Sequence, residues 1–107
     1  AIVLPVGGAF HSSYMESAKK ELEDAITSLK FNEPDKPIYQ NFDANPHLDI
    51  EKIKKNLINQ LIFPVLWTQT INKLIADNYK SFIECGPGRV LQGLVKKINR
   101  DMDVSSI

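Results

Sequence analysis

Short strand-like segments alternate with longer helical segments along this chain, and their order limits the fold to a few classes. β-branched and aromatic residues are frequent in the predicted strands, which are 2–6, 38–42 and 81–84. Apolar residues recur at helical spacing in the predicted helices, which are 14–30, 50–62, 67–78 and 88–99. This alternation predicts an α/β fold with a mainly parallel sheet. The tail from Asp101 has neither pattern, so we expect it to fray.

Capping signals mark the ends of several of these helices. Ser13 and Glu16 have the spacing of a capping box, which predicts that Ser13 caps the first helix. Asp49 is the predicted N-cap of the second helix, and Asn78 can end the third helix in the left-handed conformation. Residues 43–46 contain an Asn-Pro pair and predict a turn after the second strand.

Composition excludes several classes of protein. The chain has 107 residues, which suffice for one domain, and its 13 basic residues balance 13 acidic ones. This balance gives no reason to expect nucleic acid or a membrane as a partner, and no apolar run approaches the ~18 residues that span a bilayer. Cys85 is the single cysteine, which leaves no internal disulfide and makes the cytoplasm the expected location. Because the first residue is not methionine, we expect a piece of a longer polypeptide.

His11 is the strongest candidate for a chemical role. It follows a glycine pair at a predicted strand-to-helix corner, and an imidazole can take up and return a proton near neutral pH. The residues alone leave two interpretations open, a general base or a histidine that only satisfies a local backbone group. Ser12 and Ser13 are not credible nucleophiles for it, because adjacent residues at a helix start do not face one another.

Other candidate sites are weaker. His11, His47 and Cys85 lack the spacing of metal ligands, so we expect no metal centre. The Gly-Pro-Gly run at 86–88 is either a tight turn or, less specifically, an anion site at a helix N-terminus. Lys96 and Lys97 are consistent with favourable charge at a helix C-terminus.

Three separated stretches carry a family resemblance. They are GAFHS at 8–12, QLIFPVLW at 60–67 and ECGPGRVLQGL at 84–94. In sequence and in order they resemble the C-terminal third of malonyl-CoA:acyl carrier protein transacylases, and the resemblance covers almost the whole chain. It implies an α/β-hydrolase-like acyltransferase core with a small ferredoxin-like insert. Residues 1–10 would end that insert, and residues 11–107 would be the C-terminal part of the core.

The resemblance also implies an activity, the transfer of malonyl from malonyl-CoA to acyl carrier protein in fatty-acid synthesis through an acyl-serine intermediate. His11 matches the family's general base, and Gln60 matches the residue whose backbone carbonyl receives the other ring N–H of that base. Phe10 matches the bulky position that accompanies malonyl selectivity in related acyltransferase domains. Lys96 and Lys97 match basic residues suspected of binding the acidic carrier, and no cofactor is implied.

The chain lacks other parts of the family pattern. The serine elbow, the oxyanion-hole residues and the arginine that grips the malonyl carboxylate belong to the upstream two-thirds of the family, and Cys85 replaces a usual apolar residue. We therefore expect the missing N-terminal portion of the same enzyme to be a partner of this chain and the chain alone to be inactive. The alternatives are an acyltransferase domain of a polyketide synthase and a non-catalytic folding or docking piece.

Overall fold

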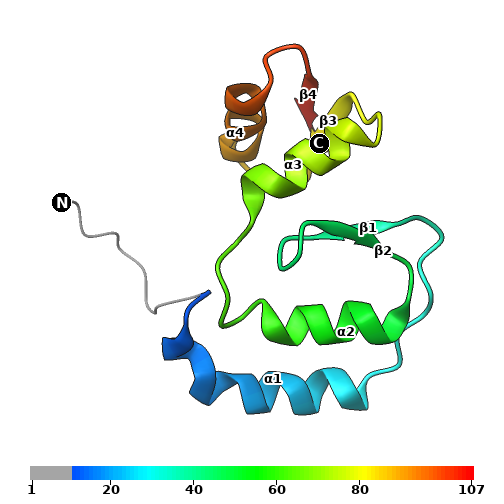
Figure 1. Ribbon diagram of the computed structural model, residues 1–107, viewed down its shortest axis with the longest axis vertical. Coiled ribbons are helices and arrows are strands. Elements are labelled where there is room, and N and C mark those ends of the chain that lie inside the picture. The colour runs from blue at the N-terminus through cyan, green and yellow to red at the C-terminus, as the bar shows by residue number, and fades with distance from the viewer. Residues whose placement is uncertain (1–10) are drawn as a thin grey trace. The chain divides into compact units, whose positions relative to one another are not determined.

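The structure is a computed structural model in which residues 11–107 are described. The chain divides into two compact units, Ala1–Leu66 and Trp67–Ile107 (Figure 1). The predicted strand at 2–6 and the candidate residue Phe10 lie outside the described residues.

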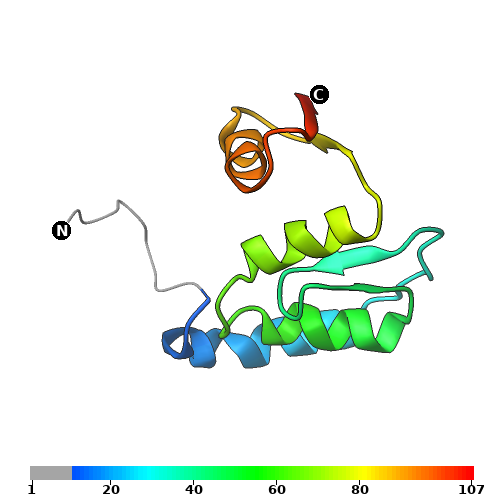
Figure 2. The same ribbon diagram turned by 45° about the horizontal axis from the view of Figure 1, so that its top comes forward.

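The described part of the first unit consists of two helices and a hairpin. Its elements are η1 (Ser13–Met15), α1 (Glu16–Ser28), β1 (Ile38–Gln40), β2 (Asn45–His47) and α2 (Ile50–Asn59). Figures 1 and 2 both show α1 beside α2 and the β1–β2 hairpin along α2. Ile26 of α1 and Ile53 of α2 are the buried aliphatic side chains of the two helices, so the apolar face of each amphipathic helix is directed inward.

The hairpin differs from the sequence prediction. A strand at 38–42 followed by a turn at 43–46 was expected, but β2 begins at Asn45 and pairs antiparallel with β1, with Tyr39 opposite Pro46. A left-handed residue at Ala44 (φ 58°) lets the chain reverse, and its N–H donates to the Gln40 carbonyl at 2.9 Å. Proline is tolerated in β2 because this two-stranded sheet has only edge strands.

The start of α1 also differs from the prediction. Ser13 does not cap a helix, because it lies inside the 3-10 turn η1, and α1 begins three residues later at Glu16. The N-cap residue of α1 is Met15, which makes no side-chain capping hydrogen bond. Asp49 does occupy the N-cap position of α2, although its side chain makes no capping bond. The capping-box interpretation is therefore wrong, because the tighter turn displaces the helix start from the serine.

The second unit is built on a parallel strand pair. Its elements are α3 (Trp67–Ala76), β3 (Ser81–Glu84), α4 (Val90–Ile98) and β4 (Asp103–Ser106). β3 pairs parallel with β4, from Ser81 opposite Asp103 to Glu84 opposite Ser106, and α4 is the crossover between them. Ile71, Val95 and Met102 form the buried cluster of this unit. As predicted, Asn78 follows α3 in the left-handed conformation (φ 75°).

The tail does not follow the prediction that it frays, because residues 103–106 form β4. Asp103 N–H donates to the Lys80 carbonyl at 2.9 Å, and Val104 packs against the buried cluster. The strand therefore depends on its partner β3 rather than on its own pattern. Within residues 11–107 the strands form two separate two-stranded sheets, one antiparallel and one parallel, so the single mainly parallel sheet that was predicted is not present there.

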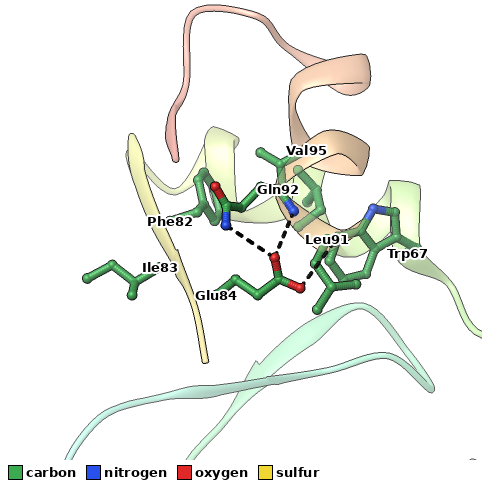
Figure 3. Close-up of a pocket in the computed structure, with 8 residues that line it drawn as sticks. Trp67, Phe82, Ile83, Glu84, Leu91, Gln92 and Val95 are labelled. Carbon is green, nitrogen blue, oxygen red and sulfur yellow. Dashed lines mark hydrogen bonds between the residues drawn. The ribbon is translucent and has the colours of Figure 1, made fainter. Parts of the chain in front are cut away.

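Glu84 closes the turn between β3 and α4. One of its carboxylate oxygens accepts from the Leu91 N–H at 3.3 Å, and the other accepts from the Gln92 N–H at 3.4 Å (Figure 3). These amides belong to the first turn of α4, where backbone donors have no partner within the helix. Gly86 and Gly88 have φ of 125° and 83°, which a residue with a side chain rarely adopts, so the Gly-Pro-Gly run is required by the turn itself.

We predict that Glu84→Ala lowers the free energy of unfolding of the full polypeptide by about 1 kcal/mol, the usual cost of losing a helix cap. Urea denaturation monitored by circular dichroism measures the change. Glu23→Ala removes an exposed carboxylate from α1 and is the matched control, which should change stability little. Equal stabilities of the two variants would show that Glu84 does not act as the cap of α4.

Candidate functional site

His11 lies at the start of the described chain in an unusual backbone conformation. Its φ is 60°, in the left-handed region that non-glycine residues seldom occupy, and its side chain is half-buried. The ring atom Nδ1 lies 2.8 Å from the backbone carbonyl oxygen of Gln60, 49 residues along the chain. A strained residue held by a distant contact is a feature that clusters at functional sites.

The contact assigns the proton of the neutral ring. A carbonyl oxygen can only accept a hydrogen bond, so Nδ1 must carry the hydrogen and Nε2 must hold the lone pair. A ring fixed in this tautomer has its basic nitrogen directed away from Gln60. His11 is therefore oriented as a proton acceptor at Nε2.

The carbonyl of Gln60 is available because α2 ends there. Gln60 is the C-cap residue, and its own N–H donates to the Asn56 carbonyl at 2.9 Å. The last carbonyls of a helix have no intrahelical donor, and the helix dipole places partial negative charge on them. A histidine N–H is a suitable donor for such a group. The contact is the one that the resemblance implied, and it uses the backbone of Gln60 rather than its amide side chain.

A buried polar cluster lies next to this helix end, and the sequence analysis missed it. Asn56 is fully buried, and its Nδ2 donates to Gln40 Oε1 at 2.9 Å and to Asp43 Oδ2 at 3.2 Å. Asp43 Oδ2 also lies 2.7 Å from His47 Nε2. One signal was available in the sequence: Asn56 is three residues after Ile53, on the face of the helix that the apolar residues predict to be buried.

The remaining described residues do not form an anion site at the Gly-Pro-Gly turn, a metal site or a membrane span. The Gly-Pro-Gly turn is not an anion site in this structure, because Glu84 already accepts from the first amides of α4 and would repel an anion. Among residues 11–107, His, Cys, Asp and Glu side chains form no group of three that could hold a metal ion. None of the helices in this described part is long and apolar enough to cross a membrane.

Lys96 and Lys97 lie in the last turn of α4, in the second unit. Lys96 Nζ donates to the Arg100 carbonyl at 3.0 Å, a contact that suits a cation at a helix C-terminus. The Lys97 side chain is exposed to solvent. Of the pair, Lys97 is the one that a partner can reach without breaking a contact.

A small pocket in the second unit is lined mainly by apolar side chains (Figure 3). Its volume is about 120 Å³, and Glu84 and Gln92 are its polar lining residues. Glu84 is already bonded to Gln92 and to the backbone of α4. Glu84, the ionisable side chain among these lining residues, is thus already engaged in hydrogen bonds within the turn.

Comparison with known proteins identifies the relatives of this chain. No family model matches the sequence. The malonyl CoA-acyl carrier protein transacylase of Bacillus subtilis strain 168 is 41% identical over 107 residues, which are all of this chain and 34% of that protein. The transacylase of Staphylococcus aureus strain COL is 40% identical over 104 residues, covering 97% of this chain and 34% of that protein.

Solved structures give the same result. The acyl carrier protein S-malonyltransferase of Vibrio cholerae superposes with a TM-score of 0.91 at 38% identity, over 97% of this chain and 34% of that chain. The malonyl-CoA:ACP transacylase of Synechocystis has a TM-score of 0.92 at 34% identity, over 97% and 36% of the two chains. A malonyl-transacylase solved in complex with a type II PKS acyl-carrier protein has a TM-score of 0.91 at 31% identity, over 97% and 34%.

The chain spans about a third of the length of these relatives. It is therefore related in sequence and in fold, over almost its whole length, to a segment of malonyl CoA-acyl carrier protein transacylases.

Proposed function

We propose that this chain is part of a malonyl-CoA:acyl carrier protein transacylase, in which it supplies the general base for malonyl transfer in fatty-acid synthesis. The bond from His11 Nδ1 to the Gln60 carbonyl is the observation that carries the proposal. It leaves Nε2 free to accept a proton, which a serine–histidine acyltransferase requires. The relatives support the choice of substrates, since they are named for malonyl-CoA and acyl carrier protein.

The proposed reaction has two half-reactions. In the first, Nε2 of His11 accepts the proton of a serine outside this chain, the serine oxygen attacks the thioester carbonyl, and coenzyme A leaves with the proton from the ring. In the second, Nε2 accepts the proton of the carrier thiol, the sulfur attacks the acyl-serine, and the serine oxygen recovers the proton. His11 is then neutral at the end of each half-reaction, ready for the next.

Gln60 would orient the ring without adding charge. A carboxylate at Nδ1, as in the hydrolase triad, would stabilise the protonated ring, whereas a neutral backbone carbonyl fixes the tautomer and the orientation. The ring returns its proton in both half-reactions, so weaker stabilisation of its charged form is compatible with rapid release.

The same proposal assigns the chain to two parts of the enzyme's fold. Residues 11–107 would complete an α/β-hydrolase-like acyltransferase core, and residues 1–10 would be the end of a ferredoxin-like subdomain. The mixed helices and strands of both units are compatible with such a core. The nucleophile, the oxyanion donors and the carboxylate clamp would come from the rest of the polypeptide, so this chain alone should not transfer malonyl.

A second candidate is an acyltransferase of polyketide synthesis. One relative of known structure is a malonyl-transacylase bound to a type II PKS acyl-carrier protein. The chemistry at His11 would be the same, and the carrier would differ. Comparing transfer rates to a fatty-acid carrier and to a polyketide carrier separates the two candidates.

We predict that His11→Ala in the full polypeptide lowers the rate of malonyl transfer by ~100-fold or more, as the loss of a positioned general base should. Gln60→Ala is the matched variant and should lower the transfer rate much less, because the backbone carbonyl of residue 60 remains. The rate of malonyl transfer from malonyl-CoA to a carrier is measured for both variants. Near-normal transfer by His11→Ala would remove His11 from the mechanism, and an equally deep loss in Gln60→Ala would mean that the side chain acts.

Carrier binding gives a second prediction. Replacing Lys96 and Lys97 with glutamate should raise the KM for the acidic carrier several-fold, because charges at the edge of a protein–protein interface mainly affect the rate at which the two proteins associate. Malonyl loading from malonyl-CoA should be nearly unchanged. The control is Lys19→Glu with Lys20→Glu on α1, which makes the same change of charge elsewhere. Equal damage to both half-reactions, or an equal effect of the control, would contradict carrier binding at α4.

Selectivity gives a third prediction, for Phe10, which lies outside the described residues. If its ring limits the acyl pocket beside His11, Phe10→Ser should relax discrimination against methylmalonyl by ~1–3 kcal/mol, the range for one methyl group in an apolar pocket. The ratio of kcat/KM for malonyl-CoA and methylmalonyl-CoA measures the change. An unchanged ratio would place the selection elsewhere.

A further inference from the structure

We infer that Asn56 is a positioning residue for His11, acting through the backbone of Gln60. The inference rests on the proposed role of His11 as the general base. The role would be indirect, since the Asn56 side chain donates to Gln40 and Asp43 rather than to the His11 ring.

Asn56 joins α2 to the hairpin. It is 0% exposed, and its Nδ2 donates to Gln40 Oε1 at 2.9 Å and to Asp43 Oδ2 at 3.2 Å. Gln40 ends β1, and Asp43 lies in the turn before β2. One amide group therefore ties the helix to two points of the hairpin.

The two acceptors are themselves held in place. Gln40 Nε2 donates to the Ile53 carbonyl of α2 at 3.1 Å, so Gln40 bonds to the helix through both ends of its amide. Asp43 Oδ2 lies 2.7 Å from His47 Nε2 of β2, and Asp43 Oδ1 accepts from the Asn45 N–H at 3.2 Å. Asn56 is thus bonded to groups that have little freedom to follow it if it moves.

A short series of bonds connects Asn56 to the candidate base. The Asn56 carbonyl accepts from the Gln60 N–H at 2.9 Å, and the Gln60 carbonyl accepts from His11 Nδ1 at 2.8 Å. The distance along the helix is about one turn, ~5.4 Å. A small rotation of the last turn of α2 would therefore carry the Gln60 carbonyl away from the ring, and a misplacement of ~1 Å can cost ~100-fold in rate.

The energetics of the site favour a specific role over simple stability. The Asn56 Oδ1 atom is buried and has no hydrogen-bond partner among residues 11–107, which is a cost that an aliphatic side chain would avoid. A buried polar group that is only partly satisfied contributes little to stability but can fix one arrangement of the elements around it. The arrangement fixed here is the one that presents the Gln60 carbonyl to His11.

The test uses the full polypeptide with ¹⁵N-labelled histidine, and long-range ¹H–¹⁵N spectra at alkaline pH report the tautomer of the His11 ring. In the wild-type protein the hydrogen should lie on Nδ1. Asn56→Leu, which has nearly the same volume and no donor, should shift the ring toward a mixture with the Nε2–H tautomer. It should also lower the rate constant for malonyl loading about 10-fold and leave the KM for malonyl-CoA within about 2-fold.

Two further variants separate positioning from stability. Asn72→Leu makes the same change at an exposed position of α3 and should change neither the tautomer nor the loading rate. The double variant Gln40→Leu with Asn56→Leu replaces both partners of the Asn56–Gln40 bond by apolar groups, so no unpaired Gln40 amide is left buried, and Asp43 keeps its contact with His47. This variant should recover part of any lost stability and keep the fold measurable if the single variant unfolds. In the double variant the His11 ring should still show the altered tautomer, and malonyl loading should still be slower than in the wild-type protein.

The outcomes are distinct. A wild-type tautomer in Asn56→Leu, or in the double variant, would overturn the inference and make Asn56 a stabilising residue only. An altered tautomer with an unchanged loading rate would keep the connection from Asn56 to the ring but would overturn the proposed function of His11. An altered tautomer together with slower loading at nearly constant KM would support both.

Discussion

The hydrogen bond between His11 Nδ1 and the Gln60 carbonyl is the interaction on which the proposed chemical role of the first unit depends. It joins residues 49 positions apart, and α1, the hairpin and α2 form the chain that connects them. Such a bond can form only if α2 ends at the right place and in the right orientation. The fold of the whole unit therefore determines which nitrogen of one imidazole is available as a base.

The end of α2 is set largely by polar contacts. Asn56, Gln40 and Asp43 join the helix to the hairpin, and the buried apolar residues among 11–66 are Ile26, Ala44 and Ile53. Hydrogen bonds have narrower preferences of distance and angle than apolar contacts, so a polar cluster fixes orientation more closely than an aliphatic one of the same size. In the second unit, the Glu84 carboxylate plays a comparable part by fixing the start of α4.

The sequence predicted the helices better than the strands or the site. α2, α3 and α4 follow from their own apolar periodicity, although α2 ends at Asn59 rather than 62. β2 and β4 were missed because each becomes a strand only through a partner, β1 or β3, and neither has a strand pattern of its own. The prediction that His11 contacts the Gln60 carbonyl came from the family resemblance, since no local sequence rule relates residues that are so far apart in the chain. Asn56 was missed because a single asparagine in a lysine-rich helix looks like a surface residue unless its helical face is considered.

If this chain contributes the base for malonyl transfer, the nucleophile should lie elsewhere in the polypeptide. The most direct measurement is the intact mass of the full polypeptide after mixing with malonyl-CoA alone, followed by peptide mapping of the acylated residue. We expect one malonyl group per polypeptide, attached to a serine outside residues 1–107 and released when a carrier is added. Absence of an acyl adduct, or an adduct on a residue within 1–107, would contradict this expectation.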